Sequence, residues 1–383
     1  MNHPALPDAR ARRPDEKVPR PVRRRDRTRR RPWYWRLLFG LTLVYIGVCL
    51  AMAYLENRLV FPGAFAENSG RNLPPSIDVN DPDQLSNALT AVQTVRYGGG
   101  GTAASHSDDL LPGRLRLRVR NQPNAAASST GNPSGRSAGE LGNAPGNEPD
   151  NAPGNEPDNA PEQRSKNWVV FFHGNGIRAV DLDRWINRLS VAFDANVFAA
   201  EYRGFTDDRD VGQSGVIADG EAAVQFVIDR FDVPISRIIL YGRSLGGGVA
   251  SAAAVRFGPA ALVMDRTFDS AVAVAAEKYP FLPVRLLMKN RFDSAARLTV
   301  YDGPLVVVHG PPDTLVPYAA GRRLYDAAAS AFKTFVESPG MGHLDAMSDD
   351  VLDQVVRAVL DNIRHHDEAT HTTKRPHGER SIQ

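Results

Sequence analysis

The sequence predicts an α/β domain, with a mostly parallel sheet and helices on both faces, preceded by one transmembrane helix. Two patterns in the 383-residue chain carry this prediction. From Asn167 onward, apolar runs of four or five residues alternate with amphipathic stretches, which is how strands buried on both faces alternate with helices. Near the N-terminus, Leu37 to Leu55 contain no charged side chain and are long enough to span a bilayer as a helix.

The segment before this apolar run is strongly basic. Residues 1–31 hold eleven arginines and Lys17 against four acidic residues, so this tail carries +8 while the whole chain carries +2. The charge bias predicts that 1–32 is a basic cytoplasmic tail, that 33–55 is a transmembrane helix contacting the lipid bilayer, and that the rest is extracytoplasmic, periplasmic in a bacterium. Because no recognisable nucleic-acid-binding fold accompanies the arginines, we expect no nucleic-acid partner.

A cleavable signal peptide is the alternative interpretation of the apolar segment. Ala51-Met52-Ala53 fits a small-x-small cleavage site after an apolar core. The long stretch before that core and its full spanning length favour a retained signal-anchor, and either alternative exports the rest of the chain. The single cysteine, Cys49, lies inside the span and is interpreted as a packing residue, so no intramolecular disulfide is expected.

Two segments of different texture follow the span. Residues 56–120 form an extracytoplasmic segment with early strands, expected at Ala91–Tyr97 and Leu115–Val119. Residues 121–166 form a low-complexity insertion, in which Asn-Ala-Pro-Gly-Asn-Glu-Pro-Asp occurs at 143–150 and again at 151–158. With no apolar position to stack, this stretch cannot bury a core and is interpreted as a flexible insertion.

Residues 167–365 form the predicted catalytic core. The last helix is the clearest element, because apolar residues from Val351 to Ile363 recur at helical spacing behind Ser348-Asp349-Asp350. A polar tail at 366–383 is predicted to be disordered, and its histidines resemble a metal-binding tract in composition only, so we predict no metal site. The predicted strands of the core are Trp168–Phe172, Val197–Ala200, Arg237–Tyr241, Ala261–Met264, Leu305–Val308 and Lys333–Val336.

One motif in the core indicates chemistry. Gly242-Arg243-Ser244-Leu245-Gly246 lies between a predicted strand and a predicted helix. Glycines on both sides of the serine allow a sharp turn that exposes the hydroxyl above the sheet. The motif occurs by chance in glycine-rich turns, but the strand before it and the helix after it favour a nucleophilic Ser244.

A serine nucleophile needs a histidine that takes its proton and a carboxylate that orients the histidine. Asp313 follows the strand Leu305–Val308, and His343 follows the strand Lys333–Val336 on a glycine-rich loop. The order Ser, Asp, His is typical of this strand-turn-helix elbow, and parallel strands bring their carboxyl ends to one sheet edge. Asp265 is the alternative acid and His309 the alternative base.

The oxyanion of an acyl-transfer intermediate needs two amide donors. The first is assigned to Leu245, the residue after the nucleophile, and the second to Asn175 in the loop His173-Gly174-Asn175-Gly176. Gly176 is the alternative second donor. His173 is interpreted as a residue that braces the loop.

These motifs resemble the membrane-anchored serine α/β-hydrolase family, related to depalmitoylases and lysophospholipases. The resemblance covers most of residues 167–365 and includes Glu201-Tyr202-Arg203-Gly204-Phe205, Thr267-Phe268-Asp269-Ser270 and Gly340-Met341-Gly342-His343. Glu56-Asn57-Arg58-Leu59-Val60-Phe61-Pro62 is similar to the family's post-membrane segment. The resemblance implies an α/β-hydrolase fold with a Ser244, Asp313, His343 triad, and with Asn175 and Leu245 as oxyanion donors.

The expected activity is therefore hydrolysis of an ester or thioester through an acyl-serine intermediate, without metal or organic cofactor. Lipids, acylated proteins and small esters are all candidate substrates, including membrane-borne ones, because fold and triad fix only the reaction class. A serine peptidase of related fold is the first alternative. A catalytically silent membrane-anchored binding protein is the second.

Overall fold

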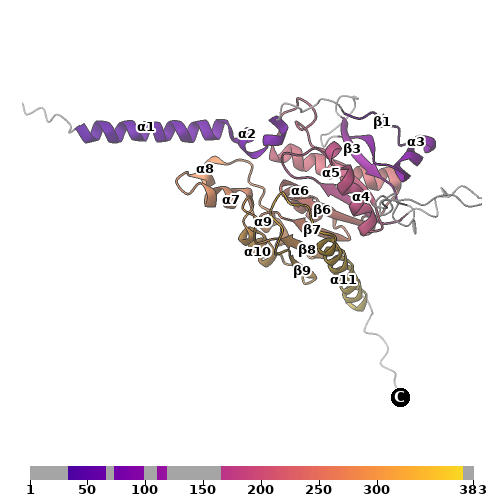
Figure 1. Ribbon diagram of the computed structural model, residues 1–383. Coiled ribbons are helices and arrows are strands. Elements are labelled where there is room, and N and C mark those ends of the chain that lie inside the picture. Colours follow the sequence, from indigo (N-terminus) through magenta and orange to yellow (C-terminus); the bar gives the residue numbers. More distant parts are fainter. Residues whose placement is uncertain (1–32, 66–72, 99–109, 119–164, 374–383) are drawn as a thin grey trace, which may run out of the picture. The chain divides into compact units, whose positions relative to one another are not determined.

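The computed structural model describes residues 33–65, 73–98, 110–118 and 165–373 (Figure 1). The predicted basic tail at 1–32, the insertion at 121–166 except for its last two residues, and the last ten residues of the chain lie outside this part. The chain divides into two compact units, Met1–Val48 and Cys49–Gln383, which are described separately.

In the first unit, the structure describes only residues 33–48, which belong to the apolar helix α1. Helix α1 spans Trp33–Tyr54, close to the predicted 33–55, and Cys49 is its one buried residue. Among the described helices, α1 alone is long and apolar enough to cross a membrane, and a membrane anchor and a signal sequence both have this character.

The second unit is built on a nine-stranded mixed sheet with the order β1-β2-β3-β5-β4-β6-β7-β8-β9. Strand β3 pairs antiparallel with β2 and with β5, and all other neighbours are parallel. This agrees with the predicted mostly parallel sheet. The strands are β1 Ser76–Ile77, β2 Gln93–Gly98, β3 Leu110–Arg116, β4 Trp168–Phe172, β5 Asn196–Ala200, β6 Ile238–Arg243, β7 Ala261–Asp265, β8 Leu305–His309 and β9 Lys333–Glu337.

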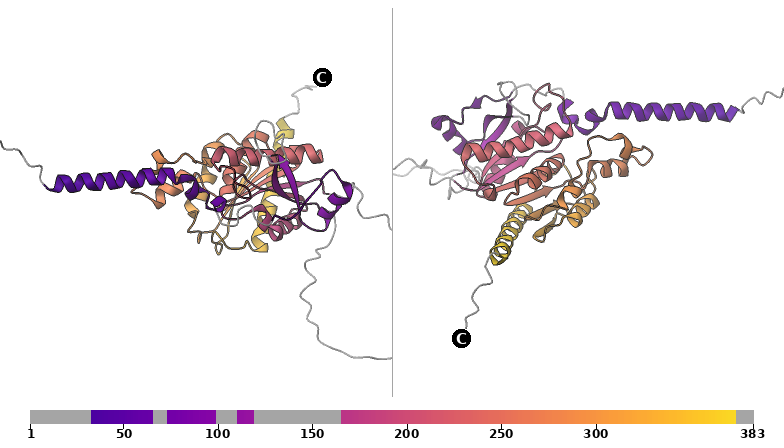
Figure 2. Two further views of the ribbon diagram at one scale, coloured as in Figure 1. Left: turned by 90° about the horizontal axis from the view of Figure 1, so that it is seen from above. Right: turned by 180° about the vertical axis from the view of Figure 1, so that it is seen from behind.

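Helices cover both faces of this sheet, as predicted. One face carries α5, α6, α9 and α10, and the opposite face carries α4 and α11. Figure 2 shows α5 and α6 in front of the sheet when the domain is seen from behind. The α-helices of the second unit are α2 Glu56–Val60, α3 Pro82–Ser86, α4 Asp183–Ala192, α5 Gln213–Phe231, α6 Leu245–Phe257, α7 Ala271–Lys278, α8 Val284–Leu287, α9 Ser294–Leu298, α10 Tyr318–Ala327 and α11 Asp349–Thr373. Single 3₁₀ turns lie at Pro62–Phe65, Asn87–Leu89, Ala179–Asp181 and Ile235–Arg237.

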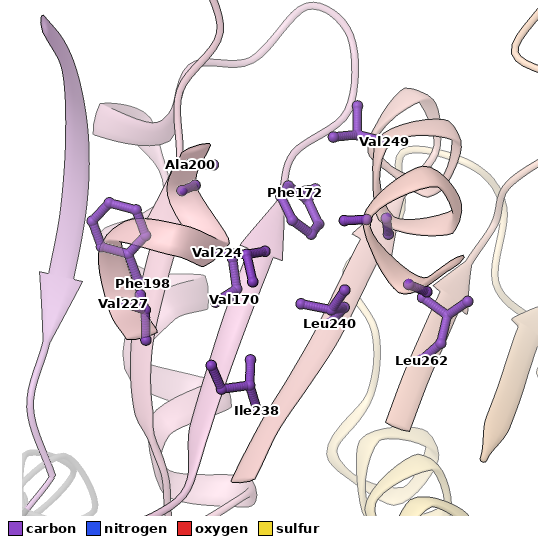
Figure 3. Close-up of a cluster of buried hydrophobic side chains, with 14 of the residues drawn as sticks. Val170, Phe172, Phe198, Ala200, Val224, Val227, Ile238, Leu240, Val249 and Leu262 are labelled. Carbon is purple, nitrogen blue, oxygen red and sulfur yellow. The ribbon is translucent and has the colours of Figure 1, made fainter. Parts of the chain in front are cut away.

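The core follows from the alternation of side chains along strands that are buried on both faces. In β4, Val170 and Phe172 point to the face covered by α5 and α6, while Val169 and Phe171 point to the face covered by α4 and α11. Figure 3 shows Val170 and Phe172 beside Leu240 of β6 and Val249 of α6. Continuous apolar runs therefore supply both cores.

The strand expected at Ala91–Tyr97 is β2, Gln93–Gly98, but the second early strand differs from the sequence prediction. The expected strand at Leu115–Val119 is instead β3, Leu110–Arg116, which includes Pro112 and Gly113. Proline is tolerated there because β3 pairs with β5 only from Arg114 onward, so Pro112 has one strand neighbour. Buried Arg114 is neutralised by Asp183, 2.5 Å away.

The C-terminal end also differs. Helix α11 continues to Thr373, so residues 366–373 are helical and the predicted boundary of a disordered tail after residue 365 was wrong. The last turns of the helix consist mostly of exposed polar residues, so no apolar periodicity in the sequence predicted them.

Candidate active site

The candidate nucleophile lies in a strained turn between β6 and α6. Ser244 has φ +53° and ψ −119°, values that a non-glycine residue rarely adopts. A Cβ added at Gly242 would lie 2.5 Å from the carbonyl oxygen of Gly246, and one at Gly246 would overlap the Phe172 carbonyl. Glycine at both positions therefore allows the strand, the turn and the helix to approach closely.

The structure brings Ser244, His343 and Asp313 into a continuous hydrogen-bonded chain. Ser244 Oγ lies 3.0 Å from His343 Nε2, and His343 Nδ1 lies 2.7 Å from Asp313 Oδ2. The histidine and the aspartate are buried. Asp313 lies in the loop after β8 and His343 in the loop after β9, so both lie at the carboxyl ends of neighbouring parallel strands. If His343 carries its proton on Nδ1, Nε2 is positioned to accept the serine proton.

The environment of Asp313 favours its ionised form. Burial opposes ionisation, but hydrogen bonds from His309 and His343 and from the backbone amide of Val316 outweigh it, so the pKa of the Asp313 carboxyl is well below its usual value. An ionised carboxylate at this distance can stabilise an imidazolium at His343.

His309, the alternative base, lies on the other side of Asp313. Its Nε2 is 3.2 Å from Asp313 Oδ2 and 3.0 Å from the Val316 carbonyl oxygen. Its Nδ1 is buried and has no hydrogen-bond partner among the described residues, and Gly321 leaves the space into which this nitrogen points. The geometry thus gives His309 a place behind the carboxylate, and gives His343 the place next to the serine.

Asp265, the alternative acid, is paired with an arginine. Asp265 Oδ1 lies 2.8 Å from Arg266 Nε, and Tyr241 donates its hydroxyl hydrogen to Asp265 Oδ2 at 3.2 Å. Burial opposes ionisation of Asp265, but the adjacent Arg266 guanidinium more than offsets it and lowers the carboxyl pKa.

This buried pair contacts the backbone around His343. Arg266 Nη1 donates to the carbonyl oxygens of Gly342, His343 and Asp345 at 3.1, 3.2 and 2.6 Å. Arg243 donates to the His343 carbonyl oxygen at 3.0 Å. The two arginines were missed as site residues from the sequence, although Arg243 lies inside the elbow motif and Arg266 follows the alternative acid Asp265.

The candidate oxyanion loop lies directly against the nucleophile. A Cβ added at Gly174 would lie 3.2 Å from Ser244 Cβ, so a side chain at this position would crowd the nucleophile. Leu245 begins α6, where the first backbone N–H groups have no acceptor within the helix. This arrangement brings the two predicted donor segments, Leu245 and the Gly174–Asn175 turn, next to Ser244.

Two side chains fix the oxyanion loop. Asn175 donates through Nδ2 to the Val60 carbonyl oxygen at 2.6 Å, and its Oδ1 accepts from the Gly63 amide at 3.2 Å. His173 is fully buried, with Nε2 2.8 Å from Glu201 Oε1. The bracing role expected for His173 agrees with this contact, and Val60 and Gly63 in the segment after α1 add a second brace that the sequence did not reveal.

The sheet order, the strained serine elbow and the helices on both faces define an α/β-hydrolase fold. Relatives agree. The chain is 37% identical over 170 residues to protein Rv2307c of Mycobacterium tuberculosis, a match that covers 44% of this chain and 58% of the relative. Protein YfhR of Escherichia coli K12 is 31% identical over 158 residues, covering 40% and 55%. The matched region thus spans little more than half the length of these relatives.

One relative and one solved structure carry more informative names. The α/β-hydrolase domain-containing protein WAV2 of Arabidopsis thaliana is 28% identical over 196 residues, covering 46% of this chain and 63% of the relative. An esterase domain from Rhodothermus marinus has a TM-score of 0.44 at 17% identity, covering 71% of this chain and 98% of that one. No protein-family model matches the chain. The chain therefore has the α/β-hydrolase fold and is similar in sequence to a protein that contains an α/β-hydrolase domain.

Proposed function

We propose that this α/β-hydrolase is a serine hydrolase that cleaves a carboxylic ester or thioester through an acyl-Ser244 intermediate. The observation that carries the proposal is the unbroken hydrogen-bond chain from Ser244 Oγ through the His343 ring to the Asp313 carboxylate. Substrates include lipid esters, acylated proteins and small esters.

The mechanism follows from the positions of these groups. His343 Nε2 accepts the Ser244 proton as Oγ attacks the substrate carbonyl, and Asp313 stabilises the resulting imidazolium. The amides of Leu245 and Asn175 donate to the tetrahedral oxyanion. His343 then protonates the leaving alcohol or thiol, and a water activated by the same histidine hydrolyses the acyl-serine.

The proposed topology places this chemistry outside the cytoplasm. Helix α1 serves as a signal-anchor, residues 1–32 stay cytoplasmic, and the catalytic core at 167–365 lies on the far side with segment 56–120. Support comes from the length and apolarity of α1 and from the arginines before it. A reporter fused after Gln383 tests the orientation, because it should be active only on the far side.

Covalent labelling tests the hydrolase proposal. Membranes containing the full chain are treated with a fluorophosphonate probe, which reacts with an activated serine. We expect labelling of wild type and no labelling of Ser244→Ala. The matched control is Ser251→Ala, seven residues further along the chain in α6. Its buried hydroxyl donates to the Gly248 carbonyl oxygen, and its loss should leave labelling intact. A folded wild-type protein without Ser244-dependent labelling would refute the proposal.

A further inference from the structure

A hairpin between α7 and α9 exposes an unusual amount of apolar surface. The hairpin comprises residues 278–291 and includes α8. Phe281 is 88% exposed, Leu286 is 87% exposed and Tyr279 is 52% exposed. Large apolar side chains clustered on one short exposed element mark an interaction surface.

The charges on the same hairpin all have one sign. Lys278, Arg285, Lys289 and Arg291 are exposed, and the fourteen residues contain no aspartate or glutamate. Basic side chains around apolar tips are typical of elements that lie in the headgroup layer of an anionic bilayer. A protein partner with an acidic rim would match the charges, but a second observation favours lipid.

That second observation is a cavity behind the hairpin. Its volume is about 170 Å³, and its wall includes Leu282, Leu287 and Met288 of the hairpin together with Met52 and Ala53 of the last turn of α1. The end of a membrane-spanning helix lies at the bilayer surface. A hairpin that shares a cavity wall with that end lies at the same surface.

Hydrogen bonds hold the base of the hairpin to the segment directly after α1. Glu56 Oε1 accepts from the Lys289 and Asn290 amides, each at 2.7 Å, and from Asn290 Nδ2 at 3.0 Å. Asn290 Nδ2 also lies 2.9 Å from Asn57 Oδ1. Because Glu56 and Asn290 are buried, these hydrogen bonds fix the base of the hairpin beside the C-terminal end of α1.

We propose that hairpin 278–291 is a second lipid-binding element, which inserts Tyr279, Phe281 and Leu286 among the lipids and places its basic side chains against anionic headgroups. The proposal rests on the proposed membrane anchor. Two contacts with the bilayer, rather than one flexible tether, then orient the catalytic domain on the membrane.

The experiment measures lipid contact at the hairpin tip in the full chain. The protein carries Cys49→Ser and Phe281→Cys, the new thiol is labelled with bimane, and the protein is reconstituted into vesicles of phosphatidylcholine and phosphatidylglycerol. Some of the lipids carry a nitroxide quencher on the acyl chain. The matched control is Leu360→Cys on α11, an exposed leucine on an element at another end of the domain (Figures 1 and 2).

We expect strong quenching at position 281 and little at position 360. Flotation with the vesicles separates this proposal from the anchor: protein that floats without quenching at 281 would overturn the hairpin proposal alone. Protein that does not float would overturn the anchor and the hairpin contact that depends on it. A label at 281 that is not quenched in lipid vesicles but is shielded from solvent in native membranes would indicate that the hairpin binds a protein partner instead of lipid.

The headgroup assignment has its own test in the same vesicles. Arg285→Gln combined with Lys289→Gln should weaken quenching at 281 when phosphatidylglycerol is present, and should change it little in phosphatidylcholine alone. Equal quenching by both proteins in both kinds of vesicle would overturn the role of the basic side chains.

Discussion

Ser244 and His343 face each other, but the protein holds them by different means. Ser244 is positioned by backbone geometry, with glycines that let β6, α6 and the loop after β4 approach closely. His343 is positioned by charged side chains, because Arg266 and Arg243 donate to the carbonyl oxygens of its loop. The serine side therefore depends on small volume, and the histidine side depends on a buried charge pair.

The largest effect is expected from breaking the histidine side. Arg266→Met keeps much of the side-chain volume but leaves the buried Asp265 carboxylate unpaired, which should lower the free energy of unfolding by about 3–5 kcal/mol. Urea denaturation of the detergent-solubilised protein measures this change. Asp265→Asn combined with Arg266→Met removes both charges and should recover part of the loss. Equal stability of single and double variants would contradict the charge-pair explanation.

A larger side chain in the turn around Ser244 should disrupt the serine side. Gly246→Ala adds a Cβ that overlaps the Phe172 carbonyl, so we expect a loss of about 1–3 kcal/mol and no labelling by the fluorophosphonate probe. Gly340→Ala is the control, because a Cβ there meets no atom within 4 Å. Normal labelling of Gly246→Ala would show that the elbow relaxes more easily than its packing indicates.

Low pH should affect the histidine side first. The folded-state pKa of Asp313 is lowered, so its ionisation stabilises the fold above the ordinary aspartate pKa of about 4, and this stabilisation is lost as the pH falls toward the lower folded value. As the pH is lowered between these two pKa values, the free energy of unfolding should decrease more steeply for wild type than for Asp313→Asn. Parallel curves would contradict this contribution.

The smallest effect is expected at the oxyanion loop. Asn175→Ala keeps the proposed backbone donor but removes the side-chain bonds to Val60 and Gly63, so we expect kcat to fall by about tenfold, equivalent to about 1.4 kcal/mol, with KM nearly unchanged. Steady-state hydrolysis of a short-chain ester measures both constants. A rise in KM alone would assign Asn175 to substrate binding instead.

The two sides also differ in how far the sequence predicts them. The elbow is a local pattern, since strand, turn and helix are contiguous and their glycines are visible in the sequence. The loops after β8 and β9 could be predicted from strand ends, which located Asp313 and His343. Arg266 and Arg243 act across the fold on a backbone about 80 to 100 residues away in the sequence, and no local signal reveals such contacts.

The strand predicted at Leu115–Val119 lies elsewhere for a related reason. Pro112, Gly113 and Arg114 argue locally against a strand, and only the limited pairing with β5 and the ion pair with Asp183 explain why one forms there. Tertiary pairing overrides local preference in this strand, while the buried strands from β4 onward follow their apolar runs directly.

Glu56, Val60 and Gly63, which bind Asn290 and the Asn175 loop, all lie after Ala53, the last residue of the small-x-small pattern in α1. Removal of residues 1–53 would take away nearly all of the apolar helix α1. It would leave in place the hydrogen bonds that join this segment to the Asn175 loop and to Asn290. The hydrogen bonds that hold the Asn175 loop beside Ser244 therefore come from residues that follow α1, and not from α1 itself.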